Sequence, residues 1–447
     1  MTSLAKLIAP QLIGTPVEVL STLENPESMR KCKVFVGSSH PELGKLVCDR
    51  LGVEPAPCTL KKFSNGETSV QIGVSIRDED VYIIQSGSPQ INDHIMELLI
   101  LISACRGGSA SKITAVIPQF PYSKQSKMKK HRGAITARML ANLLIMAGAD
   151  HVVSMDLHAS QMQGFFTKPV DNLFGAPTLA RWIRHNISDW ANAVVVSKNP
   201  GGTKRVTALA DSLKINFAMI HTDRRRTKDG YVSKNKKALK SSKPVRVQGI
   251  DEDDEEDNIV SEMQTARIVQ GHVVDDDYPV PQTPISNGIA QDKLETASII
   301  DSDALGGSYD ATNSDDDDEP TSMNLEKLIT LVGDVNNKVA IILDDMIDKP
   351  NSFIAAAEHL RLNCGAKAVY VLGTHGVFSN KCLETLNDSD CIDRIVVTNT
   401  YPIGNERIQK NEKLSVIDVS PIFAECIRRD HFGESISVLF DSLAAIE

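Results

Sequence analysis

The sequence feature that most constrains the fold is an internal repeat. A predicted helix ending at Gly148, an apolar strand and then His158 recur later as a helix ending at Gly365, a strand and His375, with the same spacing from glycine to histidine. Internal self-similarity of this kind is typical of a duplicated structural unit. We therefore predict that the chain folds as two copies of one domain.

Each copy alternates apolar runs of strand length with helical patterns. Such alternation is typical of α/β proteins with a mainly parallel sheet. The first copy is predicted to hold strands at 33–37, 81–86, 112–118 and 151–157, with helices at 91–105 and 135–148. The second is predicted to hold strands at 193–197, 215–221, 328–334, 339–345, 368–375, 392–400 and 413–420, with helices at 353–366 and 421–429.

A stretch of different composition interrupts the second copy between residues 230 and 321. Runs of aspartate and glutamate alternate there with Ser, Pro, Gly and Gln, and the apolar periodicity disappears. Low hydrophobicity combined with high charge predicts a disordered insert. The predicted organisation is an N-terminal extension at 1–28, a first domain at 29–176, the insert at 230–321, and a second domain made of 177–229 and 322–447.

The overall composition argues against several classes of protein. The 447 residues carry a formal net charge of -10, which does not suggest a nucleic-acid-binding protein. The apolar runs of the sequence are shorter than the roughly twenty residues that span a membrane. The eight cysteines are scattered without metal-binding spacing, as is typical of reduced thiols in the cytosol. We expect a cytoplasmic protein that binds neither nucleic acid nor membranes.

Three carboxylates mark the predicted ligand edge of the second copy. Asp344 and Asp345 end the strand at 339–345, and Asp348 follows in the loop. In open α/β sheets ligands bind beyond the carboxyl ends of the strands, where carboxylates can accept hydrogen bonds from sugar hydroxyls or hold a hydrated Mg²⁺. Ser352 is predicted to cap the next helix, whose N-terminus can bind a phosphate.

A second polar cluster follows the strand at 151–157. Asp156 and His158 stand two residues apart on one face of the strand end, and Asp171 can return to them after a loop. An imidazole and two carboxylates in that arrangement could meet one metal-nucleotide complex. A single histidine at a strand end is more often structural, so the assignment depends on the whole segment.

Both clusters resemble those of one enzyme family. The segment from Asp156 to Asp171 matches, over its whole length, the signature stretch of the ribose-phosphate pyrophosphokinases, also called phosphoribosyl pyrophosphate synthetases. The acidic loop after Leu343 resembles the ribose-phosphate loop of that family and of the type I phosphoribosyltransferases. The likeness covers nearly the whole chain outside the extension and the insert, and it is greatest to fungal subunits with a long acidic insert. It implies an α/β fold of two duplicated type I phosphoribosyltransferase-like domains.

The resemblance assigns roles at the metal and ribose-phosphate sites. It implies that Mg²⁺ is bound by Asp156, His158 and Asp171, and that His158 is also catalytic. A second catalytic residue is Arg224, which matches the arginine of the family's flexible catalytic loop. Binding of ribose 5-phosphate is implied for four residues of the acidic loop, namely Asp344, Asp345, Asp348 and Ser352.

The resemblance also assigns an ATP site. Phe63, Asn65 and Glu67 match a loop that reaches the adenine from a neighbouring subunit. Lys124 and Gln125 match a basic loop beside the ATP phosphates. The family reaction transfers the diphosphoryl group of MgATP to ribose 5-phosphate, giving 5-phosphoribosyl 1-diphosphate and AMP.

Three positions depart from the pattern of active relatives. Thr222 stands where they carry a lysine of the flexible loop, and Asn199 where they carry an aspartate. Pro350, which lacks an amide N–H, interrupts what is a glycine-rich phosphate loop in relatives. Since the reaction depends on positioning and charge neutralisation, each departure is expected to weaken catalysis.

Two functions remain open on these observations. The first is a working subunit of a ribose-phosphate pyrophosphokinase that assembles with homologous subunits into a hetero-oligomer. The alternative is a catalytically impaired subunit with a structural or regulatory role in that complex. A base-transferring phosphoribosyltransferase is disfavoured, because it should lack both the duplicated domain and the segment from Asp156 to Asp171.

Overall fold

The computed structural model describes residues 31–128, 133–226, 266–269, 272–275 and 325–440. The chain divides into two compact units. The larger consists of Met1–Lys198, Gly202–Phe217 and Asp334–Glu447, and the smaller of Asn199–Gly201 and Ala218–Gly333. The predicted extension at 1–28 and most of the predicted insert at 230–321 lie outside the described residues.

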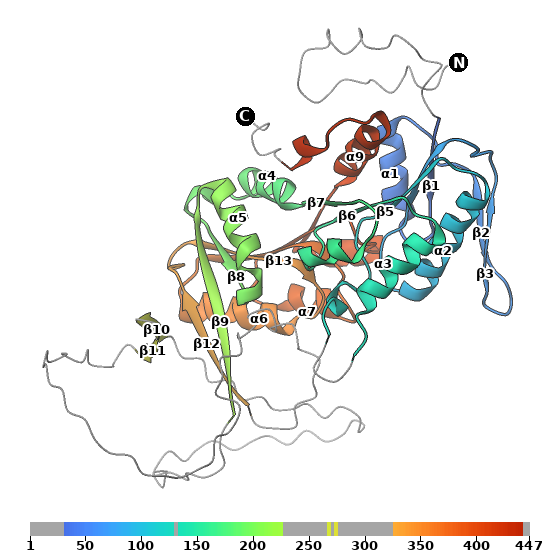
Figure 1. The fold of residues 1–447 in the computed structure, drawn as a ribbon. Coiled ribbons are helices and arrows are strands. Elements are labelled where there is room, and N and C mark those ends of the chain that lie inside the picture. Colours follow the sequence, from blue (N-terminus) through green and yellow to red (C-terminus); the bar gives the residue numbers. More distant parts are fainter. Residues whose placement is uncertain (1–30, 129–132, 227–265, 270–271, 276–324, 441–447) are drawn as a thin grey trace, which may run out of the picture. The chain divides into compact units, whose positions relative to one another are not determined.

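The first sheet of the larger unit is parallel and has the order β1-β4-β5-β6-β7 (Figure 1). Every position of β4 and β6 is buried, as expected for parallel strands covered on both faces. One face packs against α2 and α3, and the other against α1. The bounds are β1 Cys32–Val36, α1 Pro41–Leu51, β4 Asp80–Ile84, α2 Ile91–Gly107, β5 Lys112–Ile117, α3 Thr136–Ala147, β6 His151–Met155 and β7 Val170–Leu173.

The second set of parallel strands in the larger unit has the order β8-β13-β14-β15-β16. Leu179 of α4 and Leu209 of α5 pack with strand residues such as Ile341 in one apolar core. The bounds are α4 Ala176–Asn186, β8 Val194–Ser197, α5 Thr203–Leu213, β13 Val339–Ile347, α6 Asn351–Glu358, β14 Ala368–Gly376, α7 Cys382–Asp388, β15 Arg394–Thr398, α8 Asn405–Lys410 and β16 Leu414–Ile417. The predicted fold class, α/β with mainly parallel sheets, is confirmed.

The strand order corrects the way in which the repeat was aligned. The glycine-to-histidine match pairs the end of β6 with the end of β14, but β6 is fourth in its strand order and β14 is third. In topology the equivalent of β14 is β5, and the equivalent of β6 is β15. A helix followed by a strand and a histidine is a local pattern that can occur at more than one strand of the same sheet. Its spacing therefore does not identify which strands of the two copies are equivalent.

The C-terminal helix α9, Ser420–Phe432, packs on the first sheet rather than on the second. Phe423 and Ile427 share an apolar core with Leu43 and Val47 of α1, and the two helices lie side by side (Figure 1). The Arg50 Nε of α1 donates to the Ser420 Oγ at 2.7 Å. The predicted domain boundaries give this helix to the second domain by sequence, while its packing ties it to the first sheet.

In chain order, each half has an antiparallel strand pair between its first and its second parallel strand. In the first half this is β2 Cys58–Lys62 with β3 Thr68–Ile72. In the second half β9 Asn216–Arg226, most of which belongs to the smaller unit, pairs with β12 Leu325–Val332. The smaller unit also contains a short hairpin, β10 Ala266–Val269 and β11 His272–Asp275, within the stretch that was predicted to be disordered. The two halves thus share the antiparallel pair as well as the parallel strands.

Two further expectations concern the thiols and the membrane. All eight cysteines are free, as their scatter along the sequence predicts. Within the described part of the chain, the helices are too short or too polar to cross a bilayer.

Candidate active site

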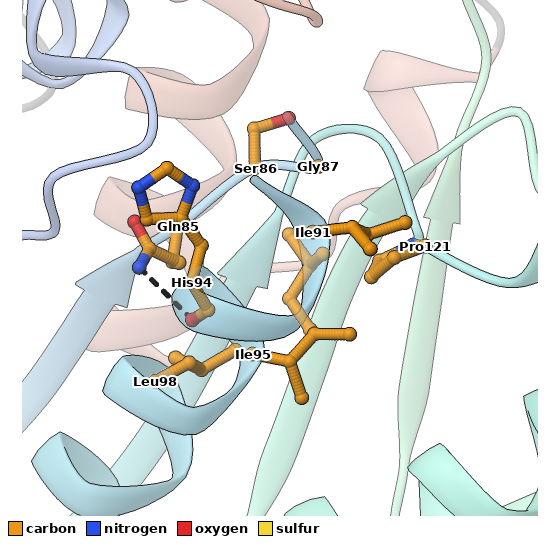
Figure 2. A pocket seen from close by; sticks show the side chains of 9 residues that line it. Gln85, Ser86, Gly87, Ile91, His94, Ile95, Leu98 and Pro121 are labelled. Carbon is orange, nitrogen blue, oxygen red and sulfur yellow. Dashed lines mark hydrogen bonds between the residues drawn. The ribbon is translucent and has the colours of Figure 1, made fainter. Parts of the chain in front are cut away.

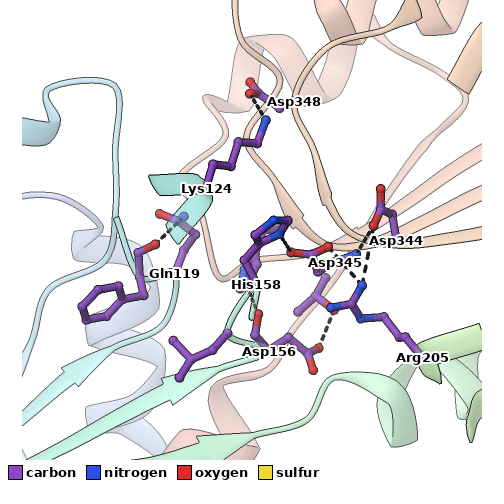
Figure 3. Close-up of polar contacts among 12 residues, drawn as sticks. Gln119, Lys124, Asp156, His158, Arg205, Asp344, Asp345 and Asp348 are labelled. Carbon is purple, nitrogen blue, oxygen red and sulfur yellow. Dashed lines mark hydrogen bonds and ion pairs between the residues drawn. The ribbon is translucent and has the colours of Figure 1, made fainter. Parts of the chain in front are cut away.

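The acidic residues of β13 meet cationic groups from several elements (Figure 3). The strand does not stop at the acidic pair as predicted, because Met346 and Ile347 continue its pairing with His375 and Gly376 of β14. Asp344 and Asp345 therefore lie inside the last part of the strand, where neighbouring side chains point to opposite faces. The nearest partners of the two carboxylates therefore differ, although Arg205 contacts both.

Lys198 pairs with Asp344 and His158 pairs with Asp345, while Arg205 contacts both carboxylates. Lys198, directly after β8, places its Nζ 3.0 Å from the Asp344 Oδ2. On the other face the Asp345 Oδ2 lies 2.7 Å from the His158 Nδ1, and the Asp345 Oδ1 lies 3.0 Å from the Arg205 Nη1 of α5. The same Arg205 nitrogen is 3.6 Å from the Asp344 Oδ1. The ion pairs thus form one chain from Lys198 to His158.

The two aspartates differ in their electrostatics. Burial raises the pKa of Asp344, and the charge of Asp345 adds to this effect, although Lys198 opposes it. Burial alone would also raise the pKa of Asp345, but Arg205 and His158 outweigh burial and hold that pKa well below its usual range. Asp345 is therefore the firmly ionised member of the pair.

The third predicted acid, Asp348, also lies in this region (Figure 3). Its Oδ2 is 2.5 Å from the Lys124 Nζ, and its Oδ1 accepts a hydrogen bond from Ser379. Burial would raise the pKa of Asp348, but the bonds from Lys124 and Ser379 dominate and lower it. Two residues predicted from separate motifs, one for ribose phosphate and one for ATP, are thus in direct contact.

Ser352 does not cap α6 as predicted. The helix begins at Asn351, its N-cap is Pro350, and Ser352 is the second helical residue. A proline fits this turn because its ring fixes φ near the helical value, which is -78° here. The Ser352 Oγ instead lies 3.2 Å from the Lys198 Nζ, which also stands 4.2 Å from the Phe353 ring.

Asp156 is tied into the fold at the end of β6. Its Oδ2 accepts hydrogen bonds from the Gly175 amide at 2.9 Å and from the Thr374 Oγ1 at 2.6 Å. Its backbone has a φ of 41°, a left-handed conformation that few non-glycine residues adopt. Strain of this kind persists where the surroundings fix the chain, and it gathers at functional sites.

Asp171 lies at a different edge of the sheet from His158. Its Oδ2 contacts the Nε2 of His151, the first residue of β6, at 3.0 Å. Because β7 runs parallel to β6, a residue near the start of β7 faces the amino end of β6 and not the carboxyl end that carries Asp156 and His158. The expected convergence of the three is therefore not observed, and the described residues contain no group of three or more potential ligands that could hold a metal ion.

The predicted adenine loop forms the tip of the hairpin β2–β3. The Phe63 side chain is 59% exposed, and the Asn65 Oδ1 accepts a hydrogen bond from the Glu67 amide at 3.1 Å. Gly66 turns the chain with a φ of 89°. An exposed aromatic ring at a hairpin tip is suited to contact another molecule. Of the basic loop, the Gln125 Oε1 accepts from the Thr136 Oγ1 at 2.6 Å.

The flexible-loop residues lie in β9. Thr222 and Arg224 lie in β9, where Arg224 pairs with Lys327 of β12, but their side chains fall outside the described part of the chain. Asn199 lies in the smaller unit.

Sequence reasoning missed three residues of the ion and hydrogen-bond network. Lys198 and Arg205 flank the loop after β8, and Thr374 precedes the end of β14. The available signal was the pair of cations around the glycines at 201 and 202, since glycine-rich loops between a strand and a helix often bind phosphates. Their aspartate partners could not be identified without the strand order.

At the corresponding edge of the first sheet, the buried carboxylate has partners inside the protein. Glu97 is buried, and its carboxylate accepts from the Ser38 amide and hydroxyl at 2.8 and 2.7 Å and from the Gln85 Nε2 at 2.8 Å. Figure 2 shows the hollow beside Gln85 and His94, whose volume of about 10 Å³ has room for about one water molecule. A nucleotide therefore does not fit in that hollow.

Comparisons with known proteins agree with this architecture. A family model described as the N-terminal domain of ribose phosphate pyrophosphokinase matches residues 32–148, and a model of the phosphoribosyl synthetase-associated domain matches residues 292–441. The crystal structure of phosphoribosylpyrophosphate synthetase from Mycobacterium smegmatis is similar with a TM-score of 0.64 and 28% identity, covering 90% of this chain and 100% of that chain.

Two curated relatives match nearly the full length. The chain is 69% identical over 432 residues to ribose-phosphate pyrophosphokinase 1 of Saccharomyces cerevisiae, covering 94% of this chain and 100% of the relative. It is 51% identical over 425 residues to ribose-phosphate pyrophosphokinase 1 of Schizosaccharomyces pombe, covering 92% of this chain and 99% of the relative. The family, and with it the expected ribose-phosphate diphosphokinase activity, is confirmed. The chain belongs to the ribose-phosphate pyrophosphokinase family.

Proposed function

We propose that the chain binds ATP and ribose 5-phosphate at the carboxyl ends of β6, β8 and β13 and acts there as a subunit of a hetero-oligomeric synthetase. The reaction would move the diphosphoryl group of MgATP to the anomeric hydroxyl of ribose 5-phosphate. The supporting observation is the alternating set of cations and carboxylates, in which Lys198, Arg205 and Lys124 each contact an aspartate. Catalysis of phosphoryl transfer rests on positioning and charge stabilisation, which such a set supplies.

The ribose 5-phosphate site is assigned to the β13 edge. Asp344 and Asp348 carry carboxylate oxygens that can accept hydrogen bonds from ribose hydroxyls. The start of α6 faces the same loop, and Lys198 beside Ser352 adds a positive charge for the 5-phosphate. The ribose hydroxyls would compete with Lys124 and Lys198 for these carboxylates. When the substrate binds, the two lysines could then contact its phosphates.

Mg²⁺ fits this site only as an ion that is shared with the substrate. Asp171 is engaged with His151 at the other edge of the sheet, so the predicted trio does not make one site. Mg²⁺ prefers to keep several waters and to bind nucleotide phosphates with one or two protein ligands, for which Asp156 and His158 remain the candidates. Bound Mg²⁺ would neutralise phosphate charge. The residues of this chain would orient the nucleotide beside it.

The ATP site is proposed to involve a neighbouring subunit. Lys124 would contact the ATP phosphates near Asp348, and Gln125 stands in the same short turn. Phe63, Asn65 and Glu67 form an exposed hairpin tip that suits a contact with a second, homologous subunit. The free cysteines suit a reducing compartment, and we place the protein in the cytoplasm.

The alternative function, an impaired structural or regulatory subunit, has one specific observation in its favour. Pro350 occupies the N-cap of α6, so the phosphate loop lacks an amide N–H at that position. Together with Thr222 and Asn199 this weakens the chain's own site, while the exposed tip at Phe63 could still complete a neighbour's site.

One assay separates the two functions. AMP production from ATP and ribose 5-phosphate is measured for the purified chain and for its complex with a co-expressed homologous subunit. Activity only in the complex supports the hetero-oligomer, and robust activity of the chain alone removes the need for partners. Asn65→Ala and Glu67→Ala should slow the complex, with Gln71→Ala on the exposed side of the same hairpin as the matched control. If both leave the rate unchanged, the chain's role is structural or regulatory.

A further inference from the structure

We infer that Asp345 is a positioning residue for His158 and that it does not contact the ribose. This inference rests on the proposed function, because it divides the work of the acidic loop within the same site. It departs from the expectation that Asp344, Asp345 and Asp348 all bind ribose 5-phosphate. Under this assignment the ribose contacts come from Asp344 and Asp348 alone.

Both oxygens of Asp345 already have strong partners inside the protein. The Oδ2 lies 2.7 Å from the His158 Nδ1, and the Oδ1 lies 3.0 Å from the Arg205 Nη1. Hydrogen bonds between ionised partners are about twice as strong as neutral ones. A sugar hydroxyl would have to displace one of them and leave a buried charge without its partner, which is costly.

The exposure of the two neighbouring aspartates also indicates that Asp344, rather than Asp345, contacts the ribose. The Asp345 side chain is 4% exposed and the Asp344 side chain 13%, although they are consecutive in β13. Because side chains alternate across a strand, Asp344 faces Lys198 while Asp345 faces His158 and the end of β6. Asp344 is therefore the more accessible of the two to a ligand.

The contact fixes the chemistry of the imidazole. A carboxylate can only accept, so the His158 Nδ1 must carry the hydrogen and the Nε2 must carry the ring's lone pair in the neutral form. In metal sites and acid–base sites, a carboxylate behind a histidine sets the tautomer and the ring orientation in this way. Arg205 in turn holds Asp345, so the order of support runs from Arg205 through Asp345 to His158.

A tautomer measurement tests the inference without requiring activity. The protein is labelled with ¹⁵N-histidine, and His158 is assigned by comparison with His158→Gln. We expect the Nδ1–H form in the ligand-free protein and a shift toward the Nε2–H form in Asp345→Asn, whose amide can donate to Nδ1. Finding the Nε2–H form in the unaltered protein overturns the inference. Because no substrate is present, an Nδ1–H result supports it even if the chain proves inactive alone.

Kinetics then distinguish positioning from substrate binding. In the active complex, Asp345→Asn should lower kcat by about 10-fold to 100-fold, as outer partners of functional histidines do, and leave the KM for ribose 5-phosphate within about threefold. Asp344→Asn is the comparison and should mainly raise that KM. A rise of KM with unchanged kcat in Asp345→Asn would make Asp345 a ribose ligand and overturn the assignment. Unfolding curves for each variant establish that the compared proteins are folded.

Discussion

The carboxyl ends of β6 and β15 are equivalent in topology but make opposite kinds of contact. Each is the fourth strand in its order. The chain after β6 contacts β13, and the chain after β15 contacts the residues that follow β4. After β6, His158 contacts Asp345 of β13 through charged groups at 2.7 Å. After β15, the Thr400 carbonyl accepts from the Ser86 Oγ beyond β4 at 2.5 Å, a neutral and buried contact. We call these the ionic junction and the neutral junction.

The difference shows what duplication leaves for function. At the neutral junction the His40 Nε2 meets the Asn399 carbonyl at 2.8 Å, and the nearby carboxylates have internal partners: Glu97 accepts from Ser38 and Gln85, and Asp418 accepts from the Asn399 Nδ2 and pairs with Arg50. At the ionic junction the carboxylates are balanced by cations that phosphate-bearing substrates can also engage. Both junctions connect the two sheets, but only the ionic junction, as proposed above, would also exchange its contacts for those of a ligand.

The largest expected effect is at the ionic junction. Replacing His158 with alanine should lower the rate of AMP formation by about 100-fold or more, since positioned acid–base groups contribute roughly 10²–10⁴-fold. Affinity for MgATP, measured by titration calorimetry, should fall as well. The fold should survive, because the His158 side chain is 18% exposed at the edge of the sheet.

Ser86→Ala at the neutral junction is the matched control for that prediction. It removes the hydroxyl that donates to the Thr400 carbonyl, and the rate per folded molecule should stay within about twofold because no charge is lost. Equal losses in the two variants would mean that both junctions act in catalysis, and the contrast between them would fail. Unchanged MgATP affinity in His158→Ala would remove the metal-nucleotide role of this histidine.

The amino end of β6 gives a prediction of pH-dependent stability. Burial lowers the pKa of His151, but its ion pairs with Asp171 and Asp430 outweigh burial and raise the pKa to about 9. A raised histidine pKa stabilises the fold fully below its unfolded value near 6.5, and the stabilisation is lost as the pH rises through about 9. This interval corresponds to a loss of about 3 kcal/mol in the free energy of unfolding.

Urea unfolding between pH 6 and pH 10 measures this loss, with His151→Gln as the test variant. The variant should be less stable at pH 6 and should show a flatter profile, because it no longer gains a proton on folding. His185, which is exposed on α4, supplies the control variant His185→Gln. A profile that keeps its slope in His151→Gln would assign the pH dependence to other groups.

The sequence predicted the α/β class, most strands and the acidic loop, because these depend on local pattern. Apolar runs such as β4 and β6 are buried at every position, and that pattern is readable without a structure. The equivalence of β6 with β14 was wrong because spacing along the chain carries no information about strand order. The place of Asp171 was missed for the same reason, since it depends on which end of β7 faces His158.

A smaller effect is expected at His375, the other histidine of the aligned repeat. It is 2% exposed, with its Nδ1 2.8 Å from the Thr400 Oγ1 and its Nε2 3.0 Å from the Met155 carbonyl. His375→Ala should lower the free energy of unfolding by about 2 kcal/mol, because it removes two buried hydrogen bonds. The rate per folded molecule should change far less than in His158→Ala, as thermal unfolding and AMP assays on the same sample can show. A rate loss as large as that of His158→Ala would mean that His375 also acts at the ionic junction.

The smallest effect is expected from removing residues 230–321 and joining β9 to β12 by a short turn. The pair β9–β12 has the same position in chain order as the hairpin β2–β3, whose short connection shows that such a turn is compatible with antiparallel pairing. Loop closure costs only about 0.6 kcal/mol for each doubling of length, so the shortened chain should melt at the same temperature or a few degrees higher. The deletion also removes β10 and β11, and β10 contacts β12. Deleting only residues 276–321 keeps that hairpin and is the control. If the larger deletion alone lowers the melting temperature, the hairpin stabilises β12, and the two antiparallel pairs are less alike than their chain order indicates.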